Sequence, residues 1–260
     1  MTEAYIRIEW WQLAIASGFV LLSGGLSVAY RLRLERDLAI GTVRTFVQLF
    51  AMGYLLRILF GLQSALLVVG LFAVMTWFAA RIVKGRVKET SVAYFGPTLL
   101  AVQVSFFLVT FAVTGVIIGA DPWWSPQYFI PIGGMVAGNS MNALAISLDR
   151  MFSELRTRRA EVEMRLCLGA EPPEASEDIF RQALRAGMIP SINSMMGVGL
   201  VSLPGMMTGQ IMGGADPADA VRYQIVVMLM LVASTALATF IVLTLVRRRC
   251  FGRAQQLLLS

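Results

Sequence analysis

The chain has 260 residues, of which 57% are hydrophobic and 15% charged, and its formal net charge is +6 at pH 7. It contains no histidine, so the commonest metal ligand and the usual general base are both missing. This composition is typical of a membrane protein, and the positive charge is explained by topology rather than by nucleic-acid binding.

Seven runs of about 20 apolar residues follow one another along the chain. A hydrocarbon core of roughly 30 Å needs about 20 helical residues to cross it, and only helices or closed barrels satisfy their backbone there. We therefore predict an all-α, multi-pass fold with about seven transmembrane helices in a single transmembrane domain, 1–260. Six spans plus a re-entrant segment at 128–148 is the main alternative. The predicted spans are 10–30, 38–60, 64–80, 97–119, 128–148, 190–213 and 223–246.

The basic residues between the runs predict which way the chain faces. Eighteen of the 22 Lys and Arg residues lie in alternate gaps, whereas the opposite side carries only Arg7, Arg57 and Arg222. Because cationic loops stay in the cytoplasm, we expect the amino terminus outside and the carboxyl terminus inside. Cys167 and Cys250 then fall in the reducing cytoplasm, where no disulfide is expected.

The second run contains Arg44, the only charge well inside a predicted span. Its guanidinium either snorkels toward the lipid head groups or contacts the transported substrate. No run contains an aspartate or glutamate, although ion-coupled carriers usually keep a carboxylate within the membrane for coupling. If the chain moves a solute uphill, the energy is therefore expected from outside the chain.

Polar side chains gather in the fifth and sixth runs. Such groups at membrane depth cost free energy unless they are paired or line a wet path, so they either bond between helices or line a translocation pathway. The candidate pathway residues in these runs are Asn139, Asn142, Asn193, Thr208 and Gln210. Methionines are also frequent here, and their thioethers suit soft ions or act as adaptable packing.

The segment 149–189 is the one substantial region outside the predicted spans. Its apolar spacing predicts an amphipathic helix that continues from the fifth span and stops at Gly169. A second helix is predicted to begin with Ser176 as its N-cap, to carry Phe180 on its apolar face, and to close at Gly187 and Pro190. Together they form a cytoplasmic helical hairpin, which either lies on the membrane surface or docks a soluble partner.

The sixth run carries Pro204-Gly205 near its middle. Proline removes a backbone hydrogen bond and glycine adds freedom, so a kinked or broken helix is predicted, either as a gate or as a static bend. The spacing of Gly205, Gly209 and Gly213 also predicts a strip along which another helix approaches closely.

Part of the cytoplasmic segment is similar to a known coupling element. Glu163, Gly169 and Ala170 resemble the core of the "EAA" loop of ABC importer permeases, although Met164-Arg165 replaces the two alanines. The resemblance implies that these residues, together with the helix that carries Phe180, couple the chain to an ATPase.

Longer strings carry a more specific resemblance, which covers essentially the whole chain. They are Arg44-x-x-x-Gln48-Leu49, Asn139-Ser140-Met141-Asn142, Leu203-Pro204-Gly205-Met206-Met207-Thr208-Gly209-Gln210 and Gln224. With the topology, they resemble the FetB (YbbM-like) family of ABC-transporter permeases, which is implicated in bacterial iron export and also contains plant aluminium-tolerance half-transporters.

The resemblance implies a permease subunit of an ABC exporter, not an enzyme, in the bacterial inner membrane. It would export iron or a related metal as a homodimer, with two copies of a cytoplasmic ABC ATPase. The chain has no phosphate-binding loop, so the partner would hydrolyse ATP and no cofactor is expected. The resemblance also adds Arg44 and Gln48 to the candidate pathway residues. The alternatives are export of a lipid-like or nucleotide-sugar cargo, a passive channel, and a membrane-embedded lipid-modifying enzyme.

Overall fold

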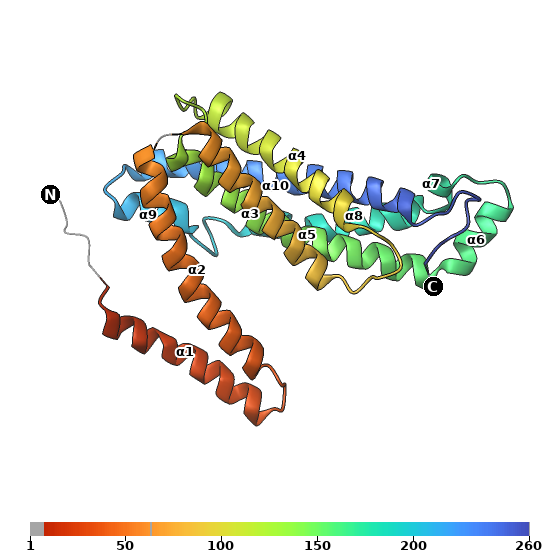
Figure 1. Ribbon diagram of the computed structural model, residues 1–260, viewed down its shortest axis with the longest axis horizontal. Helices are drawn as coiled ribbons and strands as arrows, with labels where there is room; N and C mark the ends of the chain where they lie inside the picture. The colour runs from red at the N-terminus through yellow and green to blue at the C-terminus, as the bar shows by residue number, and fades with distance from the viewer. Residues whose placement is uncertain (1–7, 63, 260) are drawn as a thin grey trace. The chain divides into compact units, whose positions relative to one another are not determined.

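The computed structural model describes residues 8–62 and 64–259, and its regular elements are all helices (Figure 1). Arg7, one of the three cations assigned to the outer side, lies outside the described residues. The helices are α1 (Trp10–Ala29), α2 (Glu35–Leu62), α3 (Ala65–Arg86), α4 (Phe95–Phe111), the π-helical turn η1 (Ala112–Ile117), α5 (Pro126–Thr157), α6 (Arg159–Cys167), α7 (Pro172–Ala175), α8 (Glu177–Gly197), α9 (Gly205–Met212) and α10 (Pro217–Arg249).

The contacts group these helices into two units. The first contains α1 and α2, and the second contains α3 to α10 apart from Met212–Gly214. Within the first unit, the Ser27 hydroxyl closes the hairpin because it donates to Glu35 at 2.8 Å and accepts from the Leu34 amide at 3.0 Å. At the other end of the hairpin the rings of Trp10 and Phe50 stack at 5.5 Å. The single domain predicted for 1–260 and the direction in which the chain crosses the membrane stay predictions.

Six helices in the described residues are long and apolar enough to cross a membrane, and they confirm six of the seven predicted runs. α5 is continuous for 32 residues despite Pro131, so no break accompanies the 128–148 stretch. The six are α1, α2, α3, α4 with η1, α5 and α10.

The sixth run, 190–213, is not one continuous helix, and it is not among the six helices of the described residues that are long and apolar enough to cross a membrane. α8 ends at Gly197, residues 198–204 are not helical, and α9 begins at Gly205. Gly199 has a φ of +84°, which glycine adopts without strain, and Pro204 has no amide hydrogen for a helix to use. The predicted break at Pro204-Gly205 is therefore present, and it extends over seven residues.

The interrupted segment still runs the length of α10 in the opposite direction (Figure 1). Glu177, at the start of α8, bonds to Arg247 near the end of α10 at 3.1 Å. Ser191, further along α8, lies 3.3 Å from Thr235 in the middle of α10. From there the chain passes the break and α9 before it returns at Pro217.

The core of the second unit forms around α5, which contacts α3, α4, α8 and α10. Its buried positions recur at spacings of three and four, the stripe expected of a helix covered on several sides. Two glycines provide the closest approaches. A Cβ on Gly133 would lie 2.5 Å from the Phe72 ring, and one on Gly187 of α8 would lie 1.8 Å from Ser147 Oγ and 2.8 Å from the Ala143 carbonyl oxygen.

The predicted glycine strip of the sixth run does not provide such contacts. Apart from chain neighbours and the backbone of the same helix, no atom of the described residues lies within 4 Å of a Cβ placed on Gly205 or Gly209. The close helix packing expected there is therefore found at Gly133 and Gly187 instead.

The segment 149–189 follows the prediction in part. Gly169, at a φ of +95°, ends α6 as predicted, and the amides of Gly169 and Ala170 bond to the Leu166 and Arg165 carbonyls at 3.0 and 3.1 Å. This pair of bonds is the Schellman motif that terminates many helices. Ser176 is the N-cap residue of α8 as predicted, but its side chain does not cap the helix, because its hydroxyl donates to the Pro172 carbonyl at 2.6 Å.

The predicted stop at Gly187 and Pro190 is also wrong. α8 passes through both residues and continues to Gly197. Because Gly187 has no side chain, α5 can approach α8 closely at this position. The glycine therefore allows helix packing and does not end the helix. A proline inside a membrane helix is tolerated where neighbouring helices support the freed backbone, and α5 and α10 both pack against α8.

Residues 250–259 fold back over the end of α10. The Leu258 amide donates to the Cys250 carbonyl and the Gly252 amide to the Gln256 carbonyl, both at 2.8 Å. Leu257 and Leu259 are buried, and the Arg159 guanidinium donates to the Leu259 carbonyl at 2.9 Å. The tail therefore links α6 to the end of α10.

The close contact at Gly187 generates a first prediction. Gly187→Ala should lower the free energy of unfolding by about 1–3 kcal/mol, because its methyl group overlaps the α5 backbone. Gly138→Ala is the matched control, since a Cβ there meets nothing within 4 Å and alanine favours a helix. Midpoints of thermal unfolding in detergent would compare them, and equal midpoints for the two variants would contradict the packing described here.

The two cysteines generate a second prediction. Cys167 is exposed, whereas Cys250 is buried, and burial raises the pKa of its thiol to about 12. Because the thiolate is the reactive form, a maleimide at pH 7 should label one thiol per native chain and two after denaturation. Mass spectrometry of the labelled peptides would assign them, and fast labelling of Cys250 in the folded protein would argue against the buried tail.

Candidate functional site

A cluster of polar side chains joins α5, α8 and α10 near the middle of the bundle. Asn139 Nδ2 donates to Ser191 Oγ at 2.9 Å and to Thr235 Oγ1 at 3.1 Å. Ser140 Oγ lies 3.3 Å from both Ser234 Oγ and Thr235 Oγ1. Thr235 is 18 residues into α10, about 27 Å from its start. Asn139 thus bonds between helices, one of the two roles that the sequence leaves open.

Sequence reasoning missed three members of this cluster. Ser191, Ser234 and Thr235 are small hydroxyl residues in apolar surroundings, and they draw little attention in a run that already reads as a span. Their partners lie 44 to 96 positions away, so only the fold brings them together.

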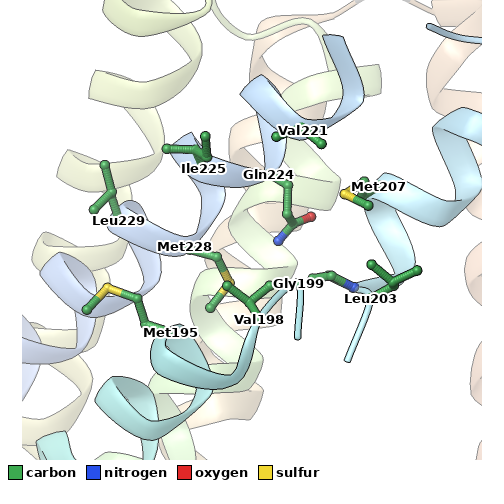
Figure 2. Close-up of a pocket in the computed structure, with 11 residues that line it drawn as sticks. Met195, Val198, Gly199, Leu203, Met207, Val221, Gln224, Ile225, Met228 and Leu229 are labelled. Carbon is green, nitrogen blue, oxygen red and sulfur yellow. The ribbon is translucent and has the colours of Figure 1, made fainter. Parts of the chain in front are cut away.

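A cavity of about 420 Å³ lies where α8 ends, between the break, the start of α9 and the first half of α10. Figure 2 shows Gln224 extending from α10 into this space, toward Gly199 in the break and Met207 on α9. Gln224 is only 5% exposed, and its Oε1 has no hydrogen-bond partner among the described residues. A buried amide oxygen without a partner is unfavourable, so this oxygen is available to a ligand or to a rearranged backbone.

The remaining walls of the cavity are apolar and flexible. Met195, Met207 and Met228 contribute thioethers, and branched aliphatic side chains contribute most of the rest (Figure 2). Methionine adapts to irregular and changing surfaces. No group of three His, Cys, Asp or Glu residues in the described part of the chain could hold a metal ion. The cavity is suited to an apolar or weakly bound molecule or to movement of the break.

The predicted pathway residues do not converge on one point. In α9, Thr208 donates to the carbonyls of Pro204 and Gly205 at 3.2 and 3.0 Å, and Gln210 has a buried Oε1 without a partner among the described residues. Asn142 and Asn193 are exposed on α5 and α8, where Asn142 Oδ1 accepts from the Arg86 guanidinium.

Arg44 and Gln48 belong to the first unit. They lie one turn apart on α2, and both are exposed. No carboxylate in the described residues pairs with Arg44, which is nine residues, or about 13 Å, from the first residue of α2. A charge at this depth is costly in lipid unless it snorkels or meets a polar partner.

Ion pairs connect the segment 149–189 to the long helices. Arg165 bonds to Glu161 of α6 at 2.7 Å and to Asp178 of α8 at 3.2 Å. Arg158 also bonds to Glu161 at 2.8 Å, and this hydrogen bond lowers the pKa of the Glu161 carboxyl. These contacts hold α6 in a fixed relation to the start of α8.

A second brace connects α8 to α10. Burial alone would raise the pKa of Glu177, but hydrogen bonds from Arg247 and Arg181 outweigh it and lower that pKa. The Arg247 guanidinium also lies over the Phe180 ring, 4.4 Å from its centre, and Phe180 meets Phe240 edge to face at 5.9 Å. A further pair, Arg156 with the buried Glu89 at 2.6 Å, joins α5 to the loop after α3.

Three of the four predicted coupling residues lie in α6 or in the turn that ends it. Glu163 pairs with Arg159 at 2.7 Å, and Gly169 and Ala170 form the helix stop. Phe180 is not with them, because it is 6% exposed and packs into the bundle.

The carboxyl-terminal part of α6 exposes apolar side chains that sequence reasoning missed. Leu168 is 81% exposed and Met164 57%, although both lie on an otherwise charged helix.

Comparisons with known proteins identify the family. A family model described as "Uncharacterised protein family (UPF0014)" matches residues 10–251. A UPF0014 membrane protein of Synechocystis sp. is 36% identical over 258 residues, which cover 99% of this chain and all of the relative. No solved structure matches the chain significantly.

Two further relatives have more informative names. "Probable iron export permease protein FetB" of Escherichia coli is 33% identical over 248 residues, 95% of this chain and 94% of the relative. "Protein ALUMINUM SENSITIVE 3" of Arabidopsis thaliana is 32% identical over 247 residues, 94% of this chain and 88% of the relative. These matches confirm the family resemblance of the sequence. The chain is a multi-pass membrane protein that belongs to the UPF0014 family, which includes the probable iron export permease FetB.

Proposed function

We propose that this protein is the membrane-spanning permease subunit of an ABC exporter, with iron or a related metal as its cargo. It would act in the bacterial inner membrane as a homodimer with two copies of a separate cytoplasmic ATPase. The name of the Escherichia coli relative, which matches over nearly the full length of both chains, supports the permease role and the cargo.

Transport against a gradient requires a source of energy. The chain has no Gly-x-x-x-x-Gly-Lys-Ser/Thr loop, so it cannot bind ATP in the manner of a P-loop ATPase. Its predicted spans also contain no carboxylate that could couple transport to protons or sodium. A partner that hydrolyses ATP supplies what the chain lacks.

The exposed end of α6 is the observation that carries the proposal. Met164 and Leu168 are one turn apart and present an apolar surface on a cytoplasmic helix. Exposed apolar side chains with a charged surround are typical of a protein–protein contact. The charged residues around them are already committed to ion pairs with each other, so the apolar pair is the part left for the ATPase.

The polar contacts of α6 with α8 and with the carboxyl-terminal tail would transmit movement of α6 to the long helices. Movement of α6 reaches α8 through Arg165 and Asp178, and it reaches α10 through Arg159 and the Leu259 carbonyl. α8 leads directly into the break and its methionine-lined cavity. ATP-driven closure of the ATPases would then change the break and switch access to the pathway. We assign Arg44, Gln48, Asn139, Asn142, Asn193, Thr208 and Gln210 to this pathway, and Pro204 and Gly205 to its gate.

A lipid-like cargo is the second candidate, and the cavity favours it. Gln224 is the one amide in largely apolar walls, which suits an amphiphile with a single polar group better than a hydrated ion.

Reconstitution with the ATPase tests the proposal. The purified chain in liposomes should bind a candidate ABC ATPase from the same genome and stimulate its hydrolysis, more so with Fe(II). Met164→Glu/Leu168→Glu should weaken that complex about tenfold or more, because it charges the centre of the contact. Leu258→Glu is the matched control, an apolar residue that is 46% exposed on the tail.

The outcomes separate the parts of the proposal. Binding without stimulation by Fe(II) would keep the permease and reject iron as the cargo, and stimulation by an amphiphile would then favour the second candidate. Unchanged binding in the double variant would move the contact away from α6. If the chain binds no ABC ATPase, the permease role itself is wrong.

Gln224 provides an independent test of the cavity. Gln224→Leu removes a buried oxygen without a partner, so the thermal midpoint should stay the same or rise. Transport in proteoliposomes should fall severalfold, because the only amide of the cavity is lost. Ile225→Leu, an apolar exchange in the same wall, is the control. Full transport by Gln224→Leu would show that the cavity is only a packing defect.

A further inference from the structure

One exposed face of the second unit is formed by α5 and α8 beside their close contact at Gly187. It contains a groove of about 520 Å³ between Ile146, Asp149 and Arg150 of α5 and Gln182, Arg185 and Ile189 of α8. Of the described helices in this unit, α8 contacts mainly α5, α7 and α10, so its groove side stays uncovered.

Polar residues make this face unsuitable for lipid contact. Asn193 is exposed, it has no hydrogen-bond partner among the described residues, and it lies about 12 Å further along α8 than Arg185. Asn142 is also exposed on the adjoining part of α5, within the predicted fifth span, although its Oδ1 accepts from the Arg86 guanidinium of α3. Uncovered amides at membrane depth are costly in hydrocarbon, so another protein surface or water is the expected neighbour.

The charges of the groove indicate which protein. Asp149 and Arg185 line it from opposite helices, are both exposed, and form no ion pair with any described residue. Most other charges in 149–189 are paired, for example Arg150 with Glu154 at 2.9 Å and Arg181 with Glu177 at 3.0 Å. A groove that carries one free charge of each sign is complementary to itself.

We propose that the α5–α8 face is the surface on which two copies of this chain meet, with Asp149 of each copy opposite Arg185 of the other. A two-fold axis brings the same patch of both subunits together, so each such pair forms twice. The exposed asparagines then face the space between the copies. This inference rests on the proposed function only in that the chain works as a pair.

Charge reversal tests the pairing. Dimerisation would be measured by energy transfer between donor- and acceptor-labelled carboxyl termini as the chain is diluted in liposomes. Asp149→Arg and Arg185→Asp should each weaken dimerisation about tenfold or more, because like charges then meet twice. The double variant Asp149→Arg/Arg185→Asp should restore it to within about threefold of the wild type. Single variants without effect, or a double variant that is no better, would overturn the pairing.

Thiol cross-linking tests the surface with its charges intact, in case a charge variant misfolds. In a Cys167→Ser background, Ile189→Cys (44% exposed in the wild type) should form a covalent dimer with a short bifunctional maleimide. Leu108→Cys on α4 is the control, because Leu108 is 54% exposed and α4 is not among the main neighbours of α8. Equal dimer yields, or a product only at Leu108→Cys, would reject this face.

Capture of the ATPase is measured on the same samples. A wild-type chain that stays monomeric but binds the ATPase would overturn the interface and the homodimer while leaving the coupling site of α6 in place. Cross-linking of Ile189→Cys to the ATPase alone would assign the face to that partner and overturn the inference. Loss of ATPase binding together with an intact dimer would reject the proposed function and keep the interface.

Discussion

The contact of α5 with α8 at Gly187 is the interaction on which the second unit depends. With no side chain at this position, α8 approaches until a Cβ would overlap Ser147 and the Ala143 carbonyl. Only at this separation can Ser191, one turn further on, reach Asn139 and Thr235 and form the polar cluster. Apolar contacts hold α5, α8 and α10 together without fixing how each helix is turned about its axis. The hydrogen bonds of the cluster are directional, so they fix the rotation of all three helices.

The contact at Gly187 also explains why the chain tolerates the non-helical residues 198–204 that follow α8. Within a membrane, irregular backbone is tolerated only where protein or an aqueous cavity surrounds it. The break satisfies part of its backbone locally, because the amides of Gly199 and Val201 bond to the Ser202 and Gly197 carbonyls at 2.9 Å. Its other neighbours are α10 and the cavity with Gln224. A rigid helix before the break and a loosely packed one after it make 198–204 the natural place for movement.

The sequence predicts the elements that follow from local pattern and misses those that depend on distant residues. Apolar runs locate six long helices because the bilayer imposes their length, and Gly169 is a reliable stop because its backbone needs a positive φ. Gly187 and Pro190 resemble the same kind of stop, yet tertiary packing overrides them.

The spacing of residues does not predict the polar cluster, the pairing of Glu89 with Arg156 or the cavity around Gln224, since each of these unites segments far apart in the chain. Phe180 lies on an apolar face, as the spacing predicts, but only the fold shows that this face packs inward against Arg247 and Phe240.

α8 has a different task on each of its sides. One side is fixed to α5 at Gly187, a second is tied to α10 through Glu177 and Arg247, and a third carries the unpaired Arg185. A force delivered to α6 enters α8 at Asp178, in the first turn beside Glu177 and ahead of Arg185 and Gly187. On the proposed function, the two fixed sides would keep α8 from bending, so the displacement passes along its axis to the break. Since the third side faces the other copy, the same displacement would also shift the two subunits against each other. One helix could then couple the ATPase both to its own gate and to the dimer, which is what alternating access between two copies requires.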